Sequence, residues 1–210
     1  MKFNTISIFI TALIGILLLS SCNHNDDRLP ILGTPTIKDN DTIYPTIQSF
    51  RFINQDGSII TENTFYNKIY VADFIFLSCP TICPKMTTEL KTVYDTFENN
   101  SNILFISHTI DPEHDTIPRL KEYATNLHID TKKWFFVTGL KDSIHKLAEN
   151  SYFSAAYADK MAPGGYVHSG GLLLVDKNKH IRGVYDGTDP IETKRLIKDI
   201  DKLLVEQFKN

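Results

Sequence analysis

Two cysteines separated by three residues, Cys79 and Cys83, come directly after an apolar run, and each is followed by a proline. A thiolate is both a nucleophile and a ligand for soft metals, so this pair predicts either thiol–disulfide exchange or metal binding. A structural disulfide is a third alternative in a protein outside the cytoplasm. We disfavour it, because closing so short a loop removes little entropy from the unfolded chain.

The residues around the second cysteine predict the beginning of a helix. Pro84 suits the first helical position, where its missing N–H costs nothing. Cys83 would then lie at or beside the N-cap, where unpaired backbone N–H groups and the helix dipole favour a thiolate. We therefore expect a reactive dithiol at this place.

His168 is the candidate for a third ligand. It lies in a glycine-rich stretch, residues 164–171, just before an apolar run, and the glycines let the backbone bend and carry the side chain toward a neighbouring strand end. Two thiolates and one imidazole form a soft donor set that suits copper better than magnesium or calcium, whereas zinc usually takes a fourth ligand. A single loop histidine is most often a surface residue, so a dithiol without metal stays open as an alternative.

The elements that must position these residues alternate along the chain. Buried strands are predicted over residues 69–77, 103–107 and 134–137. Amphipathic helices are predicted over residues 86–97, 117–127, 143–150 and 190–208. Hairpins are predicted at residues 50–60, around the Asp56–Gly57 turn, and at residues 172–185. This order predicts an α/β, thioredoxin-like fold: a mostly parallel central sheet with flanking helices and terminal β-hairpins, and the dithiol at the carboxyl end of a strand.

The first residues predict export and a lipid anchor. Lys2 precedes an apolar stretch that ends in Leu19-Ser20-Ser21-Cys22, which is the build of a secretory signal peptide with a lipobox. In such signals the cysteine becomes the first mature residue and carries lipid, so Cys22 is the predicted anchor. An uncleaved transmembrane segment is the alternative, and both place the protein outside the cytoplasm, tethered to a membrane.

This interpretation divides the chain into three parts. We expect a signal peptide over residues 1–21, a tether over residues 22–45 and one thioredoxin-like domain over residues 46–210. The net charge of −3 gives no indication of a nucleic-acid surface. The extracytoplasmic setting permits disulfides, so Cys79 and Cys83 can also form a redox disulfide.

From about Phe50 onward, the chain resembles the Sco/SenC family of copper-binding, thioredoxin-like proteins. The resemblance is carried by residues 71–86 (VADFIFLSCPTICPKM), residues 107–116 (SHTIDPEHDT) and residues 166–169 (YVHS). It implies that Cys79, Cys83 and His168 hold one copper ion, as Cu(I) or Cu(II). It also implies a part in assembling the copper centre of cytochrome c oxidase, as metallochaperone, thiol reductase or both. The partners expected on this basis are the oxidase subunit that holds that centre or another copper chaperone.

One position departs from the family pattern, because many members carry an acidic residue directly before the histidine and this chain has Val167. The change removes a supporting partner and not a ligand. The alternative function is an extracytoplasmic thiol–disulfide oxidoreductase, in which Cys79 attacks a substrate disulfide and Cys83 resolves the mixed disulfide. The longer spacing disfavours it, since the usual redox motif has two residues between its cysteines. No further catalytic residue is assigned.

A few other polar residues need an interpretation. Asp73 lies within an apolar strand, and we consider it either a proton acceptor for the dithiol or the partner of a lysine at the sheet edge. Asp115 or Thr116 is predicted to cap the following helix, and Asp111 to form a turn before Pro112. The remaining histidines are expected to be bystanders: His24, His108, His114, His128, His145 and His180.

Overall fold

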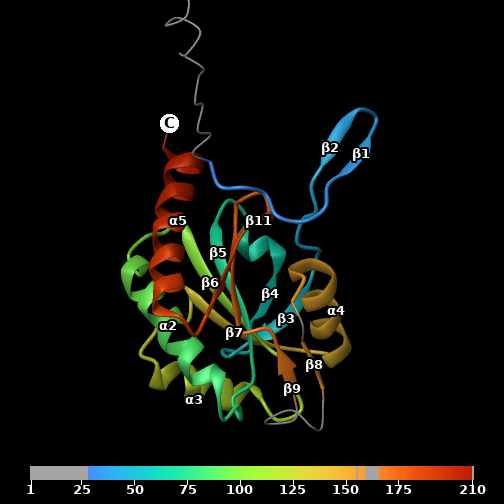
Figure 1. Ribbon diagram of the computed structural model, residues 1–210. Coiled ribbons are helices and arrows are strands. Elements are labelled where there is room, and N and C mark those ends of the chain that lie inside the picture. Colours follow the sequence, from blue (N-terminus) through green and yellow to red (C-terminus); the bar gives the residue numbers. More distant parts are fainter. Residues whose placement is uncertain (1–27, 155, 159–165, 210) are drawn as a thin grey trace, which may run out of the picture.

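The computed structural model describes residues 28–154, 156–158 and 166–209, with side chains for all of these except residues 156–158 and 166–168. Its centre is a seven-stranded mixed sheet in the order β11-β10-β5-β6-β7-β3-β4. The three central strands β5, β6 and β7 are parallel to one another, and the strands on either side of them are antiparallel. Helices α2, α3 and α5 cover one face of the sheet and α4 the other (Figure 1).

The bounds of these elements lie within about two residues of the predicted ones, except that α2 begins four residues earlier. The strands of the central sheet are β3 (Arg51–Asn54), β4 (Ile59–Thr61), β5 (Ile69–Ile75), β6 (Ile103–Thr109), β7 (Trp134–Thr138), β10 (Gly171–Val175) and β11 (Ile181–Asp186). The helices are α2 (Ile82–Phe97), α3 (Ile117–Asn126), α4 (Lys141–Tyr152) and α5 (Pro190–Phe208), with a single 3-10 turn at Glu62–Phe65. Both predicted hairpins, β3–β4 and β10–β11, are confirmed.

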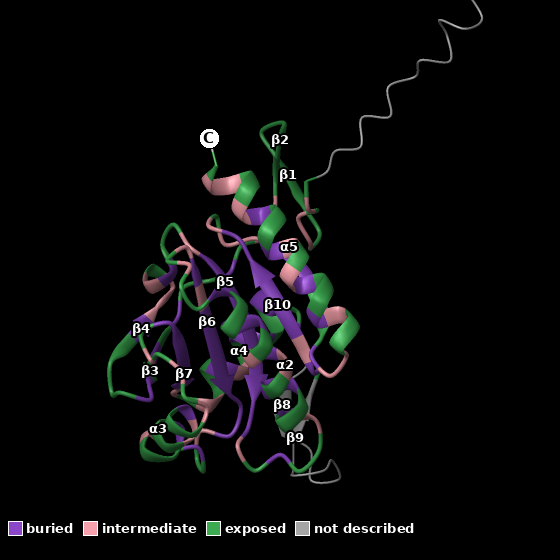
Figure 2. Ribbon diagram, turned by 90° about the vertical axis from the view of Figure 1, so that its left-hand side faces the viewer, coloured by how far each residue is buried: buried purple, intermediate pink, exposed green. Residues whose placement is uncertain are grey.

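The core lies between the central strands and the helices on both faces. All seven residues of β5 are buried, as a strand covered on both faces requires. Figure 2 shows β5, β6 and β10 as buried ribbons behind helices whose outer faces are exposed. The largest fully buried side chains include Trp134, Tyr70 and Tyr152. None of the described helices is long and apolar enough to cross a membrane.

Two small hairpins were not predicted. β1 (Thr36–Lys38) pairs with β2 (Asp41–Ile43), and β8 (Ala156–Ala158) pairs with β9 (Tyr166–His168). The turn of the first hairpin has positive φ angles at Asp39 and Asn40, residue types that tolerate this conformation. All six residues of β1 and β2 are exposed, so these strands lack the alternation of apolar and polar residues that predicts a strand.

Candidate functional site

The dithiol lies where β5 passes into α2, at the carboxyl end of a central strand as predicted. Cys79 is in the connecting loop, and Cys83 is the second residue of α2, because this helix begins at Ile82, earlier than we predicted. The N-cap residue, Thr81, makes no side-chain hydrogen bond to the helix. Backbone N–H groups of the first turn are thus available to a sulfur atom.

The two thiols are reduced and buried, but they differ in acidity. Burial raises the pKa of Cys79, yet hydrogen bonds from the backbone N–H groups of Cys83 and Thr81, and from both side chains, outweigh burial and hold this pKa below its ordinary value. Burial raises the pKa of Cys83, and the neighbouring Cys79 and Asp73 raise it further. Cys79 is therefore the more acidic thiol of the pair, and Cys83 is the less acidic thiol that donates to it.

The carboxylate of Asp115 holds the loop that leads to Cys79. This side chain is fully buried and accepts hydrogen bonds from the backbone N–H of Leu77, at 3.0 Å, and from the hydroxyl of Thr109. Of the two predicted capping residues, Thr116 is the N-cap residue of α3, although its side chain makes no capping hydrogen bond, and Asp115 does not cap this helix. The predicted turn at Asp111 is confirmed, since its carbonyl accepts hydrogen bonds from the backbone N–H groups of His114 and Asp115. Asp115 is thus a positioning residue. The sequence did not reveal this role, because an aspartate just before a helix is expected to be a cap.

Replacing Asp115 by alanine should lower the free energy of unfolding by about 1–3 kcal/mol, because the buried N–H of Leu77 loses its acceptor. Urea denaturation measures this loss. Asp115→Asn keeps an acceptor and should lose less. Asp95→Ala is the matched control, since Asp95 makes only a surface ion pair with Lys91, whose removal should cost less than about 1 kcal/mol. Equal losses in the two alanine variants would show that Asp115 does not hold the loop.

Asp73 is buried in β5 on the dithiol side of the sheet. One of its carboxylate oxygens has no hydrogen-bond partner, and the hydroxyl of Ser107 donates to the other. Burial raises the pKa of Asp73 to about 7, against a weaker lowering by Ser107. No lysine among the described residues pairs with it, so the lysine alternative is wrong. A buried carboxyl group that titrates near neutrality suits a proton acceptor, and that interpretation stays a prediction.

His168 belongs to β9, where its backbone pairs with Ala156, rather than to the loop that we predicted. Its side chain is outside the described part of the structure. Two residues later, Gly170 has a φ angle of 65°, and a Cβ atom there would lie 3.3 Å from the side chain of Ile82. The chain after His168 therefore runs against the first turn of α2, beside the residue that precedes Cys83.

The other predicted bystanders engage different partners. His114 contacts the carboxylate of Asp111, and His145 contacts the carbonyl of Ile110. His108 is enclosed by aromatic rings on the far face of the sheet. Within the described residues, no three side chains of histidine, cysteine, aspartate or glutamate gather as a metal-binding group. His24 and the predicted lipid anchor Cys22 lie outside those residues.

A reduced dithiol between a central strand and the N-terminus of the next helix, in a mixed sheet with helices on both faces, defines a thioredoxin-like protein. The sequence profile of the SCO1/SenC family matches residues 38–205. The chain therefore belongs to this family.

Known proteins support this assignment. The SCO1 protein homolog of Bacillus subtilis is 30% identical over 156 residues, which are 73% of this chain and 80% of that protein. A SCO1/SenC family lipoprotein of Bacillus anthracis has a similar crystal structure, with a TM-score of 0.69, 28% identity, and coverage of 82% of this chain and 98% of that one. BsSco, described as having a disulfide switch and as a member of the Sco family of cytochrome c oxidase assembly proteins, matches with a TM-score of 0.67, 25% identity, and coverage of 82% and 96%.

Proposed function

We propose that this protein binds one copper ion through Cys79, Cys83 and His168 and delivers it during assembly of the copper centre of cytochrome c oxidase. The observation that carries the proposal is the dithiol at the start of α2, with one acidified thiol, in a chain of the SCO1/SenC family. Gly170 supports the third ligand, because it brings the chain after His168 against the same helical turn.

The donor set explains how copper is held and released. Two thiolates with Cu(I) give a net charge of −1 and with Cu(II) a neutral site, so both oxidation states are tolerated. Loading requires Cys83 to lose its proton, which copper binding promotes because the metal ligand is the thiolate. Transfer proceeds by ligand exchange, with acceptor groups replacing these ligands one at a time. Oxidation of the two thiols to a disulfide removes two ligands, so redox state controls loading.

The proposal includes the location. Cys22 carries lipid, and the protein is an extracytoplasmic, membrane-anchored lipoprotein. More than one acyl chain gives stable anchoring, whereas a single chain binds a membrane only marginally. Anchoring raises the effective concentration of the domain near a membrane-bound recipient, which is the oxidase subunit that holds the copper centre or another copper chaperone.

Copper titration of the reduced protein tests the proposal. His168→Ala should weaken copper binding by about 100-fold or more, because loss of a direct ligand should exceed the 10–100-fold that loss of a supporting partner costs. His128→Asn is the matched control: His128 is exposed at a φ angle of 53°, a conformation that asparagine accepts, and binding should not change.

Reduction of a protein disulfide, measured on the same variants, separates the two functions. The His168→Ala variant should retain disulfide reduction, because both thiols are intact. A reduced wild-type protein that takes up no copper would overturn the proposal in favour of the oxidoreductase.

A further inference from the structure

The two ends of the central sheet carry different parts of the chain. β10 runs antiparallel to β5, with Val175 opposite Tyr70, so Asp176 lies beside the start of β5. Cys79 follows the other end of the same strand. In Figure 1, the first described residues and the C-terminal end of α5 lie at the top, whereas β8 and β9 lie at the bottom. The seven residues of β5, at about 3.3 Å each, separate the two ends by roughly 20 Å or more.

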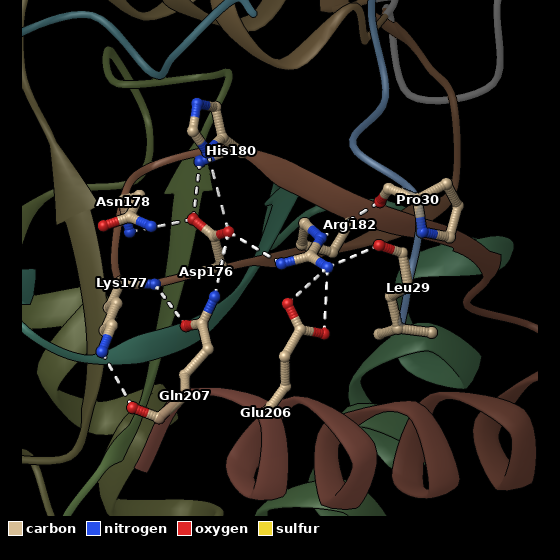
Figure 3. A network of polar contacts seen from close by, with 9 residues as sticks. All are labelled: Leu29, Pro30, Asp176, Lys177, Asn178, His180, Arg182, Glu206 and Gln207. Atoms are coloured by element: carbon tan, nitrogen blue, oxygen red, sulfur yellow. Dashed lines mark hydrogen bonds and ion pairs between the residues drawn. The ribbon is translucent and has the colours of Figure 1, made fainter. Parts of the chain in front are cut away.

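Arg182 fastens the first described residues to the end of the domain that lacks the cysteines. Its guanidinium donates hydrogen bonds to the backbone carbonyls of Leu29 and Pro30 and forms ion pairs with Asp176 and Glu206 (Figure 3). Only 4% of the Arg182 side chain is exposed. A buried, charged donor that loses a hydrogen-bond partner costs free energy of folding. The carbonyls of Leu29 and Pro30 are therefore held strongly by Arg182.

Two backbone hydrogen bonds extend this attachment along the chain. The N–H of Leu32 donates to the carbonyl of Ile181 at 2.8 Å, on the edge strand β11. Further on, the N–H of Ile47 donates to the carbonyl of Lys179 at 2.9 Å. Both acceptors belong to the region around Arg182. The chain is thus fixed to this end of the domain from its first described residues.

We propose that the cysteine end of the domain faces away from the membrane that anchors Cys22, toward a partner protein whose copper-accepting groups stand clear of the bilayer. This inference rests on the proposed lipid anchor. Six residues, 23–28, separate Cys22 from Leu29, the first residue that Arg182 holds, so this connection spans roughly 25 Å at most. That length lets the domain tilt, but it is shorter than α5, whose 19 residues run for about 28 Å along the same side of the domain, so it does not turn the cysteine end toward the bilayer.

The kind of partner follows from this geometry. Ligand exchange requires the acceptor atoms to approach the sulfur atoms directly. A recipient with its acceptor thiolates or imidazoles in a domain outside the bilayer fits the outward-facing site. A recipient whose acceptor groups lie at the lipid surface does not.

Energy transfer from a protein-bound dye to the bilayer tests the orientation. The full-length lipidated protein is placed in phosphatidylcholine–phosphatidylglycerol vesicles that carry an acceptor dye on their headgroups. One protein, Cys83→Ser, carries the donor dye on Cys79. The other, Cys79→Ser/Cys83→Ser/Asn178→Cys, carries it at position 178, beside Asp176. We expect severalfold more efficient transfer from position 178 than from Cys79.

The attachment itself is tested with Arg182→Gln in the protein labelled at Cys79. This substitution frees the segment and lengthens the connection to the bilayer, so transfer from Cys79 should rise. Lys177→Gln is the matched control: Lys177 bonds the carbonyl of Gln207 in the same network without contacting the segment, and transfer should not change.

Two results would count against the proposal. Equal energy transfer from the two dye positions, in the proteins that keep Arg182, would overturn the orientation but not the lipid anchor. This comparison does not depend on whether the Arg182 variant folds. A full-length protein that the vesicles do not retain would overturn the lipid anchor and the orientation with it, while copper binding by the dithiol would be unaffected.

Discussion

Between pH 7 and pH 4.5, His108→Phe and Asp73→Asn should change the free energy of unfolding in opposite directions, each by several kcal/mol, while that of the wild-type protein changes little. The reason is that two buried groups titrate in this range with opposite effects. Asp73 and His108 stand on neighbouring strands, and because Ser107 pairs with Asp73 and Phe74 with His108, their side chains lie on opposite faces of the sheet. Their effects should therefore add.

His108 destabilises the folded protein at low pH. It is completely buried among Phe50, Phe52, Phe74 and Tyr152, and neither ring nitrogen has a hydrogen-bond partner. Burial lowers its pKa from 6.5 to about 3. Above pH 6.5 the ring is neutral in both states and contributes nothing. As the pH falls from 6.5 toward 3, only the unfolded chain takes up the proton, and stability falls by up to about 5 kcal/mol.

Asp73 acts in the opposite direction. Burial raises its pKa from 3.8 to about 7, so between these values the folded protein holds a proton that the unfolded chain releases. Stability therefore rises as the pH falls from 7 toward 3.8, by up to about 4 kcal/mol. In the wild-type protein this gain offsets most of the loss from His108.

Urea denaturation between pH 7 and pH 4.5 separates the two groups. His108→Phe fits the aromatic surroundings and leaves Asp73 alone, so its stability should rise by roughly 3 kcal/mol on acidification. Asp73→Asn leaves His108 alone, and its stability should fall by roughly 3 kcal/mol. Other carboxylates contribute equally to the pH dependence of stability in all of these proteins. The double variant measures that contribution, and its stability should change less with pH than that of either single variant. Single variants that keep the wild-type profile would show that these groups do not titrate as described.

Alkylation of the reduced protein at pH 7 should modify Cys79 about tenfold or more faster than Cys83, because a separation of one pKa unit between two thiols already changes their thiolate ratio tenfold. The pKa of Cys79 is lowered, with burial overcome by backbone hydrogen bonds, and that of Cys83 is raised by burial. Both side chains are similarly buried, 7% and 5% exposed, so access does not explain a difference. Iodoacetamide labelling followed by peptide mass spectrometry measures both rates.

The unfolded protein provides the control for this experiment. In urea both thiols lose their surroundings and should react at similar rates. Equal rates in the folded protein would contradict the assignment of Cys79 as the more acidic thiol. As the pH rises, the rate at Cys79 should level off at a lower pH than for an ordinary thiol, whereas the rate at Cys83 should continue to rise.

Local sequence signals predicted the elements that carry the dithiol. The apolar run before Cys79 and the helical spacing after Pro84 were sufficient to place both cysteines at the end of a buried strand. The start of α2 was predicted too late, because Pro84 was assigned to the first helical position and lies instead in the third. The hairpins were predictable because turn residues separate their apolar runs.

Long-range packing produced what the sequence could not show. Asp115 has the residue type and position of a helix cap, and only the fold reveals that its acceptor atoms turn back to Leu77. The complete burial of His108 could not be predicted, because the four rings around it come from distant parts of the chain. β9 is only three residues long and lies within a glycine-rich stretch, so no periodicity distinguished it from a loop.

The attachment of Leu32 to β11 has a consequence for how copies of this protein meet. β11 is the last strand on its side of the sheet, and an uncovered last strand presents unpaired N–H and carbonyl groups that invite strand pairing between molecules. The hydrogen bond from Leu32 occupies the carbonyl of Ile181, and Arg195 occupies that of Val184. The protein thus protects itself against edge-to-edge aggregation with the same stretch of chain that leads to the proposed lipid anchor.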